Sequence, residues 1–221
     1  RNPAWWGKPE GNIDRVEFTP IASSATRVAA LLSGQVDWVD PVPVQDQDRV
    51  SGNADTALLT APELRTIFLG LDQDRDELLY SNIKGKNPFK DQKVRLAFYQ
   101  AINEDAIAKR IMRDQATPTA LMISPALFDQ ADKFKRHPYD PDASKKLLAE
   151  AGYPDGFEVT LDCPNDRYVN DEAICQAVVS MLARVGVKVT LNAQPRAKHF
   201  TQIGEAGGHS TSFYLLGWTP D

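Results

Sequence analysis

The stretch FEVTLDCPNDRYVNDEAICQAVVSMLARVGVKVTL, residues 157–191, indicates the fold class of this chain. Its first residues, 157–161, form an apolar run that predicts a strand. Residues 171–185 carry apolar side chains at helical spacing, which predicts a helix that ends at Gly186. Residues 187–191 alternate in polarity and predict a second strand. The order is therefore strand, helix, strand.

The same alternation continues toward the end of the chain. Phe200 and Ile203 predict a short helix, and residues 213–216 predict a last buried strand. Strands and helices that alternate in this way favour an open α/β sheet with helices packed on its faces. We therefore expect an α/β fold.

The clearest helix of the sequence lies just before this stretch, in YDPDASKKLLAEAGYPDGF at residues 139–157. Asp140 has the chemistry of an N-cap, Pro141 suits the first helical position, and Gly152 predicts the stop. The segment therefore predicts a capped helix that turns into the strand at residue 157.

Two further helices are predicted by NPFKDQKVRLAFYQAINEDAIAKRIMR, residues 87–113. Asp91 predicts an N-cap, and an apolar stripe at helical spacing follows it. Asn103 interrupts the stripe and can cap a second helix, with acidic residues in its first turn. We expect two short helices with a kink between them.

The first third of the chain has many breaker residues between short runs. A helix capped by Ser24 and a short helix over residues 45–50 are predicted here. β-Branched or apolar runs predict four strands, over residues 15–19, 36–39, 56–60 and 65–71. Polar, turn-rich residues 72–86 predict a loop.

Composition excludes several classes of function. The chain has 221 residues, 25 basic and 30 acidic side chains, and a formal net charge of −5. The basic residues are scattered among acids, so we expect no nucleic-acid surface. No apolar run approaches the ~20 residues that a membrane helix needs, so no membrane insertion is expected.

Five motifs make the chain resemble the family 5 solute-binding proteins, the extracytoplasmic receptors of dipeptide, oligopeptide and nickel ABC importers. The N-terminal signature of the family is matched by Asn2, Pro3, Trp6, Gly7, Asp14, Val16 and Phe18. A second is matched by Arg27, Ala29, Ala30, Leu31, Ser33, Gly34, Val36 and Asp37. The others are the segments 87–113 and 139–157 described above and the terminal GWTPD.

The resemblance implies a fold and a domain organisation. The implied fold is the type II periplasmic-binding architecture, in which two α/β lobes joined by hinge strands close on a ligand. We expect residues 1–64 to be part of the first lobe and hinge, and residues 65–221 to be the second lobe. Full-length members of the family run to roughly twice this length, and both ends of the chain look cut, so we expect a central to C-terminal fragment.

The resemblance also implies a function. We expect the solute-binding component of an ABC importer, periplasmic or lipid-anchored outside the cell, that captures short peptides as a monomer and delivers them to a membrane permease. One alternative is a nickel chelate, opine, sugar or glutathione as ligand. Another is a ligand-sensing domain of a transcription regulator, because this module also occurs fused to helix-turn-helix domains.

Catalytic and metal-binding patterns are poor in this sequence. His137, His199 and His209 are far apart, and we interpret them as surface or loop histidines. Cys163 and Cys175 do not have a zinc spacing, and we interpret them as a strand-end thiol and a helix thiol. No nucleophile elbow or phosphate-binding loop is present. We therefore expect no enzyme, no cofactor and no metal site.

Arg167 is the first candidate ligand-binding residue. It lies in the loop between strand 157–161 and helix 171–185, and such loops line the ligand-binding edge of open α/β sheets. Its planar fork suits a carboxylate. The alternative is a solvated arginine that pairs with Asp162 or Asp166. The resemblance favours the first interpretation, because an arginine in this loop holds the ligand's C-terminal carboxylate in dipeptide-binding members.

Asp221 is the second candidate, in the terminal motif GWTPD. The resemblance implies that this aspartate takes the α-ammonium of a peptide, while a frayed terminal residue is the alternative. Trp218 would supply a flat apolar wall, and Thr219 completes the predicted ligand-binding residues. The head groups of Arg167 and Asp221 should then lie roughly 8–13 Å apart to hold a dipeptide.

Overall fold

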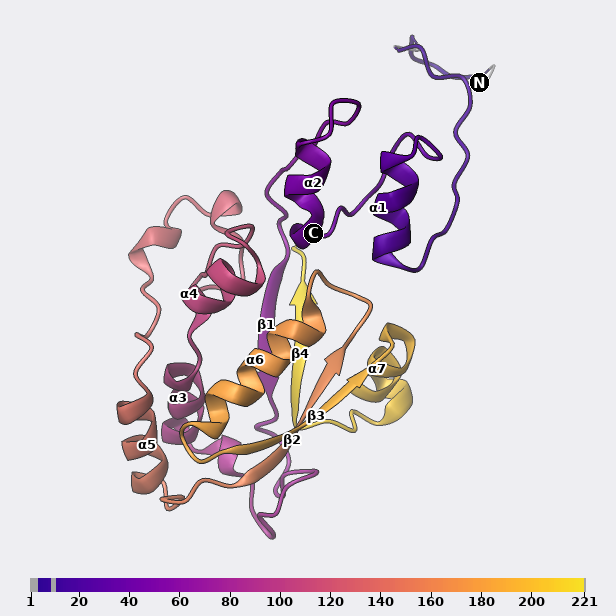
Figure 1. Ribbon diagram of the computed structural model, residues 1–221. Coiled ribbons are helices and arrows are strands. Elements are labelled where there is room, and N and C mark those ends of the chain that lie inside the picture. Colours follow the sequence, from indigo (N-terminus) through magenta and orange to yellow (C-terminus); the bar gives the residue numbers. More distant parts are fainter. Residues whose placement is uncertain (1–3, 9–10, 221) are drawn as a thin grey trace. The chain divides into compact units, whose positions relative to one another are not determined.

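The computed structural model describes residues 4–8 and 11–220 (Figure 1). Contacts divide the chain into two compact units, residues 1–59 and residues 60–221. A division by contacts does not assign the lobes of a receptor, so the lobe boundary at residues 64 and 65 stays a prediction.

The smaller unit is built from helices α1 (Ser24–Leu32) and α2 (Gln47–Ser51), with one 3₁₀ turn at Val44–Asp46 before α2. The side chain of Ser23 caps α1 by accepting from the backbone N–H of Thr26 at 3.3 Å, one residue before the predicted cap.

The strands predicted over residues 15–19, 36–39 and 56–60 are wrong, because no residue of these ranges is in a strand. A strand forms only when a neighbouring strand pairs with its backbone. Several large apolar side chains of this unit are instead exposed: Trp5, Trp6, Ile13, Val16, Phe18, Trp38 and Leu59.

The larger unit contains a four-stranded sheet of order β1-β4-β2-β3. Its strands are β1 (Thr66–Leu71), β2 (Glu158–Pro164), β3 (Lys188–Gln194) and β4 (Phe213–Trp218). β2 pairs in parallel with both β3 and β4, whereas β1 is antiparallel to β4. The predicted open α/β fold is confirmed, and the sheet is mixed.

Helices cover this sheet, and their bounds are α3 (Gln92–Ala101), α4 (Glu104–Ala106), α5 (Pro141–Glu150), α6 (Asp171–Ala183) and α7 (Arg196–Ile203). A π-helical turn over Ile107–Ile111 continues α4. α3 and α5 lie side by side and pack against each other (Figure 1). α6 packs against β2 and β3. Between α4 and α5 the chain is irregular and has two 3₁₀ turns, at Pro125–Leu127 and Ala131–Lys133.

The predicted caps of these helices are confirmed. The carboxylate of Asp91 accepts from Lys93 N at 2.8 Å, and that of Asp140 accepts from Ala143 N at 2.9 Å. The side-chain oxygen of Asn103 accepts from the backbone N–H at residue 106 at 2.8 Å, which starts α4 after the predicted kink. These short-range contacts fix where the covering helices begin.

A hydrophobic core joins the sheet to α3, α5 and α6. Four aromatic rings meet in it, with centroid distances between 5.1 and 6.2 Å, and they belong to Phe89, Phe98, Phe157 and Phe213. Val159 and Leu161 point from β2 into the same core. The packed core holds the strands in fixed positions, and with them the strand ends.

All four strands contribute to one edge of the sheet, which we call the carboxyl edge. It consists of the carboxyl ends of β2, β3 and β4 and the amino end of β1. Pro164 lies opposite Gln194 across β2 and β3, and Trp218 lies opposite Thr66 across β4 and β1. The segments that follow β2, β3 and β4 and the segment that precedes β1 therefore lie at the same edge.

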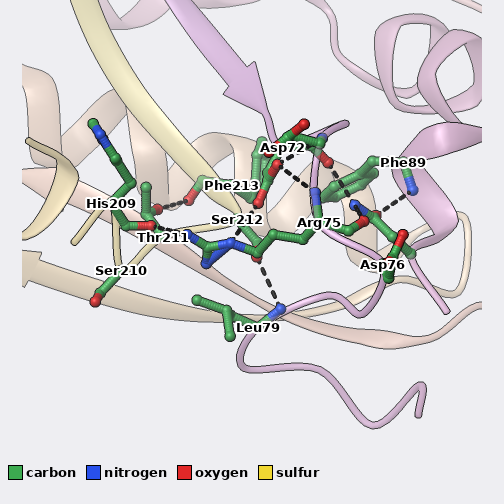
Figure 2. A network of polar contacts seen from close by, with 12 residues as sticks. Asp72, Arg75, Asp76, Leu79, Phe89, His209, Ser210, Thr211, Ser212 and Phe213 are labelled. Atoms are coloured by element: carbon green, nitrogen blue, oxygen red, sulfur yellow. Dashed lines mark hydrogen bonds and ion pairs between the residues drawn. The ribbon is translucent and has the colours of Figure 1, made fainter. Parts of the chain in front are cut away.

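The opposite edge is closed by a polar network that includes the residues in Figure 2. The Arg75 side chain lies between Asp72, with which it forms an ion pair at 3.0 Å, and the backbone carbonyl of His209, to which it donates (Figure 2). The hydroxyl of Ser212 accepts from Leu79 N at 2.9 Å. The network fastens the long loop after β1 to the start of β4.

Candidate ligand-binding site

The loop that carries Arg167 is shorter than the sequence predicts. β2 extends to Pro164, so Asp162 and Cys163 belong to the strand and not to the loop. The loop is residues 165–170, and it connects the carboxyl end of β2 to α6. Arg167 thus lies at the carboxyl edge, where the sequence places it.

The buried carboxylate of Asp171 shapes this loop. One oxygen accepts from the backbone N–H groups of Arg167 and Tyr168, each at 2.9 Å, and the other accepts from Glu172 N at 2.9 Å. Asn170, just before it, has a left-handed backbone with φ of 54°. Asp171 therefore folds the loop back over the first turn of α6.

The two acids that could have paired with Arg167 are engaged elsewhere. Asp162 is fully buried and accepts from Asn192 Nδ2 at 2.7 Å and from Thr211 Oγ1 at 2.6 Å. Asp166 accepts from the backbone N–H of Arg196 at 2.5 Å, at the start of α7. Across the described ranges, the Arg167 guanidinium has no carboxylate partner.

The Arg167 guanidinium lies instead over the ring of Tyr168, with its Cζ 4.9 Å from the ring centroid. The hydroxyl of Tyr168 accepts from Gly217 N of β4 at 2.9 Å. This bond ties the Arg167 loop to the terminal motif. Arg65, next to the start of β1, has its Cζ 5.8 Å from the same ring.

The other predicted ligand-binding residues lie on or beyond the last strand. Trp218 is the last residue of β4 and is 55% exposed, so its ring is available to a ligand. Thr219 accepts a hydrogen bond from Arg65 Nε at 3.2 Å. Asp221 lies outside the described residues, so its predicted distance from Arg167 stays a prediction.

Sequence reasoning missed Arg65, Tyr168 and Asp171 as parts of this site. Arg65 immediately precedes a predicted strand and Tyr168 follows Arg167, so their positions in the sequence gave a signal. For Asp171 the signal was a carboxylate at the start of a predicted helix. None of the three contacts within the site could be derived from spacing alone.

Cys163 and Cys175 form a disulfide, so interpreting them as two separate thiols is wrong. Their Cα atoms are 6.6 Å apart, and the bond joins the end of β2 to α6. It closes the segment that contains the Arg167 loop. Disulfides form and persist in oxidising compartments.

His199 is fully buried in α7, so interpreting it as a surface or loop histidine is wrong. Its Nε2 lies 3.0 Å from the carbonyl oxygen of Leu215, and its Nδ1 has no hydrogen-bond partner among the described residues. Burial lowers the pKa of His199 below 6.5, although the Leu215 carbonyl, Asp162 and Asp171 act in the opposite direction.

Two cavities lie within the larger unit. One cavity of about 330 Å³ lies beside the polar network and is lined by Asp72, Arg75 and Tyr214, among others. A second, of about 290 Å³, lies between α7 and one face of β2 and β3 and is lined by Asp162 and Lys198, among others. Arg167 lines neither of these two cavities.

Two further features are absent from the described ranges. No helix there is long and apolar enough to cross a membrane. No three His, Cys, Asp or Glu side chains within those ranges are grouped so that they could hold a metal ion.

The whole chain, residues 1–221, matches the sequence model for bacterial extracellular solute-binding proteins, family 5 middle. The glutathione-binding protein GsiB of Escherichia coli K12 is 27% identical over 217 residues, which are 97% of this chain and 40% of that protein. The chain therefore spans about 40% of the length of the curated relatives that it matches.

Solved structures share the fold. The periplasmic binding protein DppA of Helicobacter pylori, in complex with the peptide STSA, has a TM-score of 0.84 at 23% identity, over 100% of this chain and 40% of that one. A dipeptide-binding protein of Pseudoalteromonas sp. SM9913, in complex with Met-Leu, has a TM-score of 0.73 at 23% identity, over 90% and 37%. At these identities the likeness shows the fold alone.

Proposed function

Because this chain belongs to the bacterial extracellular solute-binding proteins of family 5, we propose that it captures short peptides for an ABC importer. In this proposal the protein is a monomer that catalyses no reaction and delivers its ligand to permease subunits. It acts outside the cytoplasm, in the periplasm or, in a Gram-positive source, attached to the membrane by a lipid anchor. The Cys163–Cys175 disulfide supports an oxidising compartment, and it speaks against the sensing domain of a cytosolic regulator.

One observation carries the proposal: the Arg167 guanidinium stands at the carboxyl edge with no carboxylate partner in the described part of the chain. A guanidinium makes bidentate, charge-assisted hydrogen bonds to a carboxylate, and the C-terminus of a peptide supplies one. Trp218 would pack against the peptide, Thr219 would line the site, and Asp221 would take the α-ammonium group.

The test compares Ala-Ala with its C-terminal amide by calorimetry on the full-length protein. We expect the amide to bind much more weakly, because it cannot form the charged pair with Arg167. In Arg167→Gln the affinity for Ala-Ala should fall by at least about 30-fold, since loss of one partner of a desolvated charge pair costs ~2–5 kcal/mol.

Arg184→Gln is the matched control, because Arg184 is an exposed arginine that ends α6 away from the carboxyl edge. It should leave the affinity unchanged. Equal affinity for Ala-Ala and its amide would refute carboxylate capture by this edge.

Glutathione is a second candidate ligand, because a curated relative at 27% identity is a glutathione-binding protein. Glutathione is itself a tripeptide and carries two carboxylates. Including it in the same titrations decides between the two ligands, because a receptor for unmodified dipeptides should prefer Ala-Ala.

A further inference from the structure

A second arginine stands at the carboxyl edge beside Arg167. Arg65 precedes the first residue of β1, and Thr219 follows the last residue of β4. Because Thr66 and Trp218 are partners in the sheet, Arg65 and Thr219 face each other across the strand ends, and Arg65 Nε donates to Thr219 Oγ1 at 3.2 Å. The position of Arg65 is thus set by the sheet.

Arg65 and Arg167 share one aromatic ring. Their Cζ atoms lie 5.8 and 4.9 Å from the centroid of Tyr168. The two guanidinium carbons are therefore at most about 11 Å apart. Two guanidinium groups that close to one ring give the edge two sets of charged hydrogen-bond donors for anionic groups.

Gly217 allows this arrangement. A Cβ atom at residue 217 would lie 2.7 Å from Tyr168 Cε1 and 2.8 Å from Arg65 Cδ. Both side chains therefore pack directly on the β4 backbone, where a larger residue would push them away. The close approach holds Arg65 and Tyr168 in place beside Arg167.

Only one carboxylate in the described ranges pairs with either arginine. Glu63 lies 2.6 Å from Arg65 Nη1, and its side chain is 61% exposed whereas that of Arg65 is 24% exposed. Because the Glu63 side of this pair is exposed to solvent, a ligand carboxylate in an enclosed site can replace Glu63.

We propose that Arg65 is a second carboxylate subsite and that the preferred ligands are short peptides with an acidic C-terminal residue. This inference rests on the proposed function. Arg167 takes the terminal carboxylate, and Arg65 takes the carboxylate of the Asp or Glu side chain. Both groups belong to one residue, so they lie close enough to reach two guanidinium groups across the Tyr168 ring.

The test is calorimetry on the full-length protein with Ala-Glu and with its neutral isostere Ala-Gln. We expect Ala-Glu to bind about tenfold more tightly, because only Ala-Glu forms the second charge-assisted contact. Arg65→Gln should remove that preference, so that this variant binds Ala-Glu and Ala-Gln with equal affinity. Glu63→Gln should act in the opposite direction and strengthen Ala-Glu binding severalfold, since it removes the competing carboxylate.

Arg136→Gln is the matched control, because Arg136 is also a partly buried arginine with acidic partners, Glu104 and Asp105. It should leave both affinities unchanged. Equal binding of Ala-Glu and Ala-Gln by the wild type would overturn the Arg65 subsite and leave peptide capture standing. Binding of no peptide at all would overturn both proposals.

Discussion

Asp171 explains how a loop of six residues presents Arg167 in a defined position. Its buried carboxylate accepts three backbone N–H groups, and two of them belong to Arg167 and Tyr168. Backbone groups that are fixed in this way leave only side-chain torsions free, so a ligand meets a partly preorganised guanidinium. At the scale of single residues, the site is therefore an arrangement of one buried acid, one ring and two cations.

His199 provides a prediction at the same scale. A carbonyl oxygen only accepts, so Nε2 of His199 carries the proton donated to Leu215 O, and the unpartnered Nδ1 is unprotonated in the neutral ring. Protonation of Nδ1 would place a cation in a buried site. Burial accordingly lowers the pKa of His199 in the folded protein below 6.5.

The expected pH dependence follows from that direction. As the pH falls below 6.5, the unfolded chain binds the proton before the folded one does, so folding stability is lost between 6.5 and the lower folded pKa. In His199→Gln, whose amide can still donate to Leu215 O, this loss should be absent. Urea unfolding of wild type and variant should be measured from pH 8 to pH 5. The difference between their free energies of unfolding should shrink as the pH falls, and a constant difference would contradict the prediction.

At the scale of elements, features decided by neighbours in the chain could be predicted, and those decided by distant partners could not. The caps Asp91, Asn103 and Asp140 act within three residues, and all three are confirmed. Strands were predicted correctly where another strand pairs with them, as β1 does with β4, and wrongly at residues 15–19 and 36–39. A run of apolar residues indicates burial and β-propensity, but it does not indicate whether a neighbouring strand pairs with the segment.

The same distinction explains the site. Arg167 could be predicted because a loop after a parallel strand reaches the carboxyl edge whatever its details. The roles of Tyr168 and Arg65 depend on Gly217, which lies 49 residues beyond Tyr168 in the chain. The pairing of β4 with β1 on one side and with β2 on the other brings these residues together.

The disulfide gives a prediction at the scale of elements. Cys163 and Cys175 are separated by 12 residues, and a cross-link over a loop of this size stabilises by about 3 kcal/mol in chain-entropy estimates. The free energy of unfolding of the double variant Cys163→Ala and Cys175→Ala should therefore be about 2–4 kcal/mol lower, so the variant should unfold at a lower urea concentration. Wild type kept in a strong reductant is the control and should lose a similar amount. Unchanged stability in both samples would show that the bond contributes nothing to the β2–α6 connection.

At the scale of the whole molecule, the carboxyl edge supplies one side of the proposed site. Arg167, the Tyr168 ring and Trp218 lie at this edge, and Arg167 lines neither of the two cavities described above. Burying a charged peptide between this edge and a second surface would strengthen every contact, because the effective dielectric constant falls when water leaves. The chain spans about 40% of the length of its curated relatives. In the proposed receptor, the second surface belongs to the other lobe.

Closure of two lobes around a peptide is therefore the prediction for the full-length protein. A ligand shifts an open–closed equilibrium only by its differential affinity for the two forms, and a peptide held from both sides binds the closed form more tightly. Small-angle X-ray scattering should show a smaller radius of gyration when Ala-Ala is added at about 100 times its Kd, where binding also stabilises the fold by ~2.7 kcal/mol. Arg167→Gln, whose affinity is at least about 30-fold lower, should gain at most about 0.9 kcal/mol at the same peptide concentration and show a smaller change in the radius of gyration. The peptide could instead stabilise the wild type without changing its radius of gyration. That result would rule out lobe closure but not peptide capture, because the peptide would then bind to the carboxyl edge alone.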